Sequence, residues 1–107
     1  MKEILLVCGG GASSGFLAQK MNEAAKANGI AAHVEAIGES EIEDYIDDKE
    51  LVMVGPHLKY LEDDLKEILD EYEVPFTFIP QEYYGALDGA STLQYGLDIL
   101  NKERRNI

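Results

Sequence analysis

The chain has 107 residues, with 21 acidic and 9 basic side chains and a net charge of −12 at pH 7. This length suits one domain spanning residues 1–107, and a hydrophobic content of 46% argues against general disorder. The negative charge repels phosphates and argues against a nucleic-acid partner. No apolar run approaches the roughly 20 residues of a membrane span, so we expect a cytoplasmic protein without direct membrane insertion. A single cysteine excludes an internal disulfide and a multi-cysteine metal site, and we expect neither a metal nor a cofactor.

The first predicted elements are a strand and a helix. An apolar run from Glu3 to Cys8 ends in three glycines, which is typical of a buried strand in a parallel sheet. Ser13 or Ser14 is placed to cap the helix that follows. Apolar side chains then recur at helical spacing until Asn28-Gly29, which supplies the end of the helix.

The middle of the chain repeats this alternation. A second strand is predicted from Ile30 to Ile37, followed by a short acidic helix or turn from Ser40 to Asp47. Leu51 to Val54 predict a third, buried strand, which Gly55-Pro56 closes. A helix follows, because apolar side chains recur along one face from Leu58 to Tyr72.

The last third of the chain adds one more strand and one more helix. The fourth strand is predicted from Pro75 to Ile79 and ends at Pro80. A loop from Gln81 to Gly89 then leads to a final helix, whose buried face contains Leu93, Leu97 and Leu100.

The alternation predicts an α/β fold of three layers, with helices on both faces of a four-stranded parallel sheet. We expect the strand order 2-1-3-4 of a small flavodoxin-like sheet. Ligands of such sheets bind beyond the carboxyl ends of the strands, at the switch point beside the first strand. Cys8 and the segment Gly55-Pro56-His57 both fall at this edge.

The loop after the first strand has the composition of an anion-binding nest. Glycines let backbone N–H groups converge, and a helix N-terminus adds unpaired donors and a partial positive charge. An exposed thiol at the rim of such a nest is expected to have a pKa below its usual value of about 8.5. Cys8 is therefore the candidate nucleophile. The candidate phosphate-binding residues are Gly9, Gly10, Gly11, Ala12, Ser13, Ser14 and Gly15.

Other phosphate-binding loops fit this segment less well. A Walker loop needs a lysine directly after its last glycine, and the first lysine here is Lys20. Low-molecular-weight phosphatases and similar arsenate-reductase-like thiol enzymes place an arginine six residues after the cysteine, to clamp phosphate. Ser14 occupies that position, which favours a carrier over a hydrolase. A buried structural cysteine and a non-catalytic anion-binding module remain alternatives.

The whole chain resembles the IIB components of the bacterial phosphotransferase system, of the lactose/cellobiose/chitobiose type. Three stretches carry the resemblance. The first is a Cys-x-x-Gly-x-Ser/Thr-Ser/Thr loop at Cys8, Gly11, Ser13 and Ser14. The second is a Gly-Pro-x-x-x-Tyr stretch at Gly55, Pro56 and Tyr60. The third is a Tyr-Gly-x-x-Asp-Gly stretch at Tyr84, Gly85, Asp88 and Gly89.

The resemblance implies a relay. A IIA component would pass a phosphoryl group from its phosphohistidine to Cys8. Cys8 would pass it to a sugar, such as a β-disaccharide, bound in the membrane component IIC. The chain would then be recruited to the membrane through IIC.

Two further side chains are candidates for contact with this site. His57 follows the third strand at the ligand-binding edge, and Tyr84 belongs to the third matching stretch. Asp88-Gly89 more simply forms a turn, since an inward carboxylate would repel phosphate.

Overall fold

The computed structural model describes the backbone of residues 1–8 and 12–105, and the side chains of these ranges except residues 12–14 and 103–105. Its sheet has four parallel strands in the order β2-β1-β3-β4. The strands are β1 (Lys2–Val7), β2 (Ala32–Ile37), β3 (Leu51–Val54) and β4 (Phe76–Phe78). The predicted flavodoxin-like order is confirmed.

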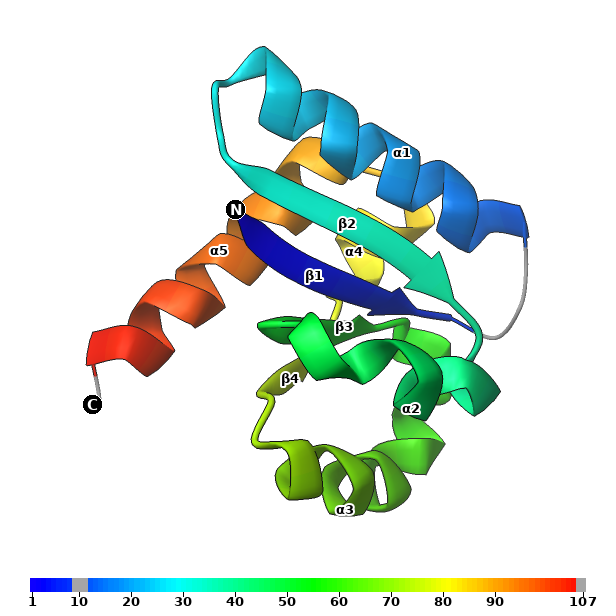
Figure 1. Cartoon of the computed structure of the whole chain (residues 1–107). Coiled ribbons are helices and arrows are strands. Elements are labelled where there is room, and N and C mark those ends of the chain that lie inside the picture. Colours follow the sequence, from blue (N-terminus) through cyan, green and yellow to red (C-terminus); the bar gives the residue numbers. More distant parts are fainter. Residues whose placement is uncertain (9–11, 106–107) are drawn as a thin grey trace.

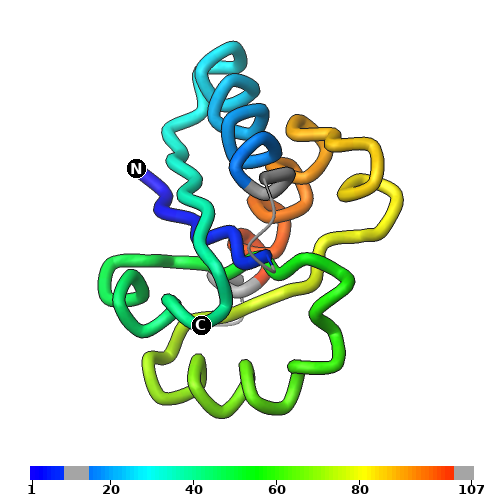
Figure 2. The backbone as a smooth tube through the Cα atoms, turned by 90° about the vertical axis from the view of Figure 1, so that its right-hand side faces the viewer, coloured from blue at the N-terminus to red at the C-terminus, as the bar shows by residue number. Residues whose placement is uncertain are grey.

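Helices cover both faces of this sheet (Figure 1). On one face lie α1 (Ala12–Ala27) and α5 (Gly89–Arg105), which pack against each other. On the other lie α2 (Ile42–Tyr45) and α3 (Glu62–Tyr72). Figure 2 shows the same layers from the side, with α1 and α5 together above the sheet and α3 below it. The short helix α4 (Gln81–Gly85) connects β4 to α5.

The two central strands separate two apolar clusters. Alternate side chains of a strand point to opposite faces, so β1 contributes Ile4 and Leu6 to one cluster and Leu5 and Val7 to the other. The first cluster contains the inward residues of α1 and α5, and the second those of α2 and α3. Ile4 to Val7 of β1 and all of β3 are buried on both faces, so these stretches are uninterrupted apolar runs rather than alternating patterns.

Several predicted boundaries differ from the structure. The helix α1 begins at Ala12, so Ser13 and Ser14 lie inside its first turn and neither is its N-cap. The predicted helix from Leu58 is divided, since a 3₁₀ helix, η3 (Pro56–Leu61), precedes α3. The acidic stretch after β2 is η1 (Glu39–Glu41), α2 and η2 (Ile46–Asp48).

The segment predicted as a loop from Gln81 to Gly89 is partly helical. It contains α4, whose N–H groups of Tyr83 and Tyr84 both donate to the carbonyl of Pro80, each at 3.0 Å. Five residues are too few for apolar periodicity to be visible in the sequence, and Pro80 fixes the start of the turn instead. This short helix matters because it carries Tyr84.

Asp88 does more than form a turn. It precedes the first residue of α5, and its carboxylate accepts the N–H of Ser91 at 3.0 Å and the Ser91 hydroxyl at 2.8 Å. These hydrogen bonds lower the pKa of Asp88, because they favour its ionised form. Asp88 is therefore the N-cap of α5.

Candidate functional site

Cys8 follows the last residue of β1, and its backbone N–H donates to the carbonyl of Ile37 at 3.2 Å. Its side chain continues the series of Ile4 and Leu6 and faces the cluster beneath α1 and α5. Only 1% of the residue is exposed. The prediction of an exposed thiol is therefore wrong, because the strand alternation directs this side chain inward.

Two donors reach the Cys8 sulfur inside the protein. One is the Tyr84 hydroxyl of α4, and the other is the backbone N–H of Gly55, directly after β3. Burial raises the pKa of the Cys8 thiol, while both hydrogen bonds oppose that rise. The predicted fall in the pKa of Cys8 is thus also wrong, since lost hydration of the thiolate outweighs the two donors.

The Cys8 sulfur and the His57 ring both lie next to the Cα atom of Gly55. A Cβ atom at Gly55 would lie 3.5 Å from the Cys8 Sγ and only 2.6 Å from the His57 Cε1. It would also lie 2.9 Å from the His57 Nδ1. The space that a side chain at Gly55 would fill is therefore occupied by the imidazole. The N–H of Gly55 also donates to the carbonyl of Val7 at 2.9 Å, which ties β3 to β1 at this point.

Tyr84 and His57 contact each other beside the thiol. Their ring centroids lie 5.4 Å apart with planes tilted by 41°. The adjacent Tyr83 packs edge-on against Tyr95 of α5, with centroids 6.4 Å apart, and so holds α4 against α5. The two side chains that the sequence suggested as neighbours of the site, His57 and Tyr84, are thus brought together with Cys8.

The structure describes only part of the predicted phosphate-binding loop. Gly9, Gly10 and Gly11 lie outside the described residues, as do the side chains of Ala12, Ser13 and Ser14. The backbone from Ala12 to Gly15 forms the first turn of α1, whose N–H groups have no partner within a helix. Gly15 is exposed, and a Cβ atom there would contact nothing within 4 Å.

Two arginines, Arg104 and Arg105, are the only ones in the sequence. They end α5, which runs away from the edge that holds Cys8 (Figure 1). In the described backbone, neither arginine position therefore lies at the edge that a phosphate clamp of the phosphatase type would need.

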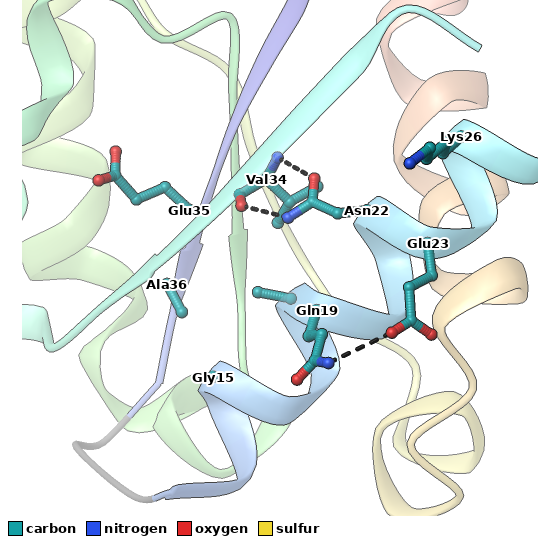
Figure 3. A pocket seen from close by; sticks show the side chains of 9 residues that line it. Gly15, Gln19, Asn22, Glu23, Lys26, Val34, Glu35 and Ala36 are labelled. Atoms are coloured by element: carbon teal, nitrogen blue, oxygen red, sulfur yellow. Dashed lines mark hydrogen bonds between the residues drawn. The ribbon is translucent and has the colours of Figure 1, made fainter. Parts of the chain in front are cut away.

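Two shallow grooves flank α1 in the described part of the chain. One, of about 560 Å³, lies between α1 and the edge strand β2 (Figure 3). There the Asn22 amide donates to the carbonyl of Val34 at 2.9 Å and accepts its N–H at 2.8 Å. Asn22 thus pairs with the open edge of β2 as a neighbouring strand would. Neither groove is lined by Cys8, His57 or Tyr84.

Within the described parts of residues 1–8 and 12–105, no three or more His, Cys, Asp or Glu side chains are grouped as metal ligands. The helices there are all too short or too polar to cross a bilayer.

Sequence reasoning missed the contribution of Gly55. The signal was present, because a glycine follows the third strand at the same sheet edge as Cys8. The Gly55 N–H reaches the Cys8 sulfur because of the register between β1 and β3, in which Val7 lies opposite Val54. The sequence does not show this register.

Comparison with known proteins shows the family to which this chain is similar. Residues 3–94 match the family described as the lactose/cellobiose-specific IIB subunit of the PTS system. The oligo-β-mannoside-specific EIIB component of Bacillus subtilis (strain 168) is 30% identical over 100 residues, which are 94% of this chain and 97% of that protein. The lactose-specific EIICB component of Lacticaseibacillus casei is 32% identical over 72 residues, which are 67% of this chain and 12% of that longer protein.

Two solved structures share the fold. The cellobiose-specific IIB component from Borrelia burgdorferi superposes with a TM-score of 0.78 at 32% identity, covering 94% of this chain and 93% of that one. The lactose-specific IIB domain from Streptococcus pneumoniae gives a TM-score of 0.81 at 18% identity, covering 91% and 95%.

Proposed function

We propose that this chain, a member of the lactose/cellobiose-specific IIB subunit family of the PTS system, carries a phosphoryl group on Cys8. A IIA component is the proposed donor, through its phosphohistidine. A sugar bound to the membrane component IIC is the proposed acceptor. The names of the relatives, for oligo-β-mannoside, lactose and cellobiose, support a β-linked disaccharide as the sugar class.

The proposed chemistry consists of two transfers. In the first, the Cys8 sulfur attacks phosphorus, a P–S bond forms and the P–N bond of the donor histidine breaks. The thiol loses a proton, and the leaving imidazole nitrogen takes one up. In the second, a sugar hydroxyl attacks, the P–S bond breaks, and the sulfur regains the proton that the hydroxyl releases. Such transfers mainly require positioning and charge stabilisation.

One observation carries this proposal, namely the place of Cys8 between the end of β1 and the first turn of α1 in a chain of this family. N–H groups of a helix N-terminus are suited to hold the phosphoryl oxygens. We assign this role to the residues from Gly9 to Gly15, with the Ser13 and Ser14 hydroxyls as further donors. Because the thiol is buried, the proposal requires the Cys8 sulfur to become accessible to the donor phosphoryl group during transfer.

Residues 1–107 are proposed to act as one IIB domain in the cytoplasm, brought to the membrane by IIC. A phosphatase or arsenate-reductase-like activity is the second candidate. It has less support, because Ser14 stands where those enzymes need an arginine and the arginines of this chain end α5.

The test is phosphorylation in a reconstituted system. The protein is incubated with phosphoenolpyruvate, the general phosphotransferase proteins and IIA partners of the lactose and cellobiose types. Intact mass is expected to rise by one phosphoryl group (HPO3), and Cys8→Ser and Cys8→Ala are expected to show no increase. Absence of the adduct with every IIA partner contradicts the carrier role.

The alternatives give different results in the same preparation. Turnover of p-nitrophenyl phosphate that requires Cys8 favours a phosphatase. Phosphate binding that persists in Cys8→Ala, without any covalent adduct, favours an anion-binding module.

A further inference from the structure

The proposed carrier role leaves open how a buried thiol becomes a nucleophile. Cys8 is 1% exposed, and an apolar environment favours its neutral form. The attacking species in phosphoryl transfer is the thiolate, and the thiolate is again the leaving group when the P–S bond breaks. Any group that stabilises negative charge on the sulfur therefore assists both transfers.

We propose that Tyr84 is a catalytic residue of this chain, whose hydroxyl donates to the Cys8 sulfur and stabilises its negative charge in both transfers. This inference rests on the proposed function of Cys8. His57 is assigned a positioning role, since it acts on the sulfur through the Tyr84 ring.

The first support is the convergence of two donors on one sulfur. The Tyr84 hydroxyl comes from α4 and the Gly55 N–H from the residue directly after β3, so the two donors belong to separate elements. Hydrogen bonds to a charged acceptor are stronger than those to a neutral one, so both donors favour the thiolate over the thiol.

The second support is the way in which the Tyr84 ring is held. His57 packs against it at 5.4 Å between centroids, from the side of η3. The absence of a side chain at Gly55 leaves the space that the imidazole occupies. On the other side, the backbone N–H of Asp88 donates to the carbonyl of Tyr83 at 2.9 Å and fixes the end of α4.

Few titratable side chains of the described residues lie near the Cys8 sulfur, so few groups can affect the pKa of this thiol. Among the described residues, the titratable side chains packed against the cluster that contains Cys8 are Tyr83 and Tyr84 from α4 and Tyr95 from α5, and His57 from η3 lies against the Tyr84 ring. Of these, only Tyr84 donates a hydrogen bond to the sulfur. From β1, α1 and α5, the cluster around Cys8 contains apolar side chains, including Leu6, Leu17 and Leu93. A change in Cys8 ionisation after a substitution at Tyr84 therefore reports on the hydroxyl itself.

The decisive experiment measures the ionisation of Cys8 without any phosphoryl donor. The chain has one cysteine, so cysteine labelled with ¹³C at Cβ gives a single NMR resonance to follow with pH. Tyr84→Phe is expected to lower the acid dissociation constant of Cys8 about tenfold, the size of one charge-assisted hydrogen bond. Tyr83→Phe, which changes the neighbouring ring on the same helix, is the matched control and is expected to leave it unchanged.

The kinetic arm uses the intact reconstituted system. Tyr84→Phe is expected to slow phosphorylation about tenfold near pH 7, with KM for IIA unchanged and most of the rate recovered at higher pH. His57→Ala is expected to lower the rate less, and His57→Phe to restore it, since a phenyl ring still supports Tyr84. Thermal melts show whether each variant is folded.

The outcomes separate this inference from the proposed function. An unchanged Cys8 pKa in folded Tyr84→Phe overturns the role of Tyr84, even if Cys8 is phosphorylated. A changed pKa in that variant, with no phosphorylation of the wild type, supports the action of Tyr84 on the sulfur and overturns the carrier role.

Discussion

Cys8 and Lys49 both have titratable side chains that are almost completely buried, but the fold favours the neutral form of Cys8 and the charged form of Lys49. Cys8 lies at the carboxyl edge of the sheet, where Tyr84 and Gly55 donate hydrogen bonds to its sulfur. Burial raises the pKa of the thiol and so favours its neutral form. Lys49 precedes β3, at the amino edge, and its side chain is 6% exposed. Its ammonium lies 3.2 Å from the Asp48 carboxylate and 3.3 Å from that of Glu35.

The balance of burial and partners explains the difference. Burial by itself lowers the pKa of Lys49, but hydrogen bonds and attraction from Asp48 and Glu35 together raise it, so the ammonium stays charged. Glu3 of β1, at 3.9 Å, adds a further carboxylate. One edge of the sheet thus uses a permanent charge to join β1 and β2 to the segment before β3. The other keeps a group that has to change its charge during the proposed reaction.

The largest effect on stability is expected from Lys49→Met. The substitution leaves Glu3 and Glu35 facing each other without their shared cation. We expect a loss of about 1–2 kcal/mol, below the cost for a fully buried pair because the carboxylates are partly exposed. Urea denaturation measures it. Phosphorylation of Cys8 is expected to be unchanged, and a parallel loss of phosphorylation would show that the two edges are coupled.

Asp88→Ala extends the comparison to a charge held mainly by hydrogen bonds from Ser91, with a smaller attraction from Lys20. It removes the N-cap of α5, so a decrease of a few degrees in Tm is expected at pH 7. Because the pKa of Asp88 is lowered in the folded chain, its contribution is present above about pH 3.8 and is lost as pH falls through the folded value.

The control for this prediction is Asp98→Ala, which removes an exposed carboxylate in the middle of the same helix. It is expected to change Tm less than Asp88→Ala does. Equal changes in the two variants contradict the capping role.

Gly55→Ala is expected to cost little stability, about 0.5–1 kcal/mol, because the atom that it meets is the end of the exposed His57 side chain. The ring is expected to turn away from Tyr84, which the NMR shift of the His57 Hε1 proton detects. Gly15→Ala, where a Cβ atom meets nothing within 4 Å, is the control. An unmoved His57 resonance in Gly55→Ala would contradict the described packing.

The smallest effect is expected from the ionisation of Cys8 itself. Its pKa is raised on folding, so its contribution to stability is present below the unfolded value of about 8.5 and is lost as pH rises toward the folded value. The decrease in unfolding free energy between pH 8 and pH 10 is therefore expected to be smaller in Cys8→Ala than in the wild type. Equal decreases would show that the thiol does not contribute.

Local patterns in the sequence were sufficient for the architecture. Uninterrupted apolar runs before glycines mark strands that are buried on both faces, as in Leu51–Val54. Alternation with helices of clear periodicity leaves few allowed topologies, and the order 2-1-3-4 follows from them. The place of Cys8 at the carboxyl edge follows in turn, since it comes directly after the first strand.

Tertiary structure alone decided the state of that cysteine. Its burial results from the joint packing of β1, α1 and α5, and burial reverses the pKa shift that the glycine-rich loop suggested for Cys8. Tyr84 reaches the sulfur because α4, too short to be visible as a periodic pattern, turns it toward β1. The sequence by itself therefore determined where the nucleophile lies, through local and periodic interactions. Only the folded chain determined how the sulfur is solvated and held, because those properties depend on groups distant in sequence.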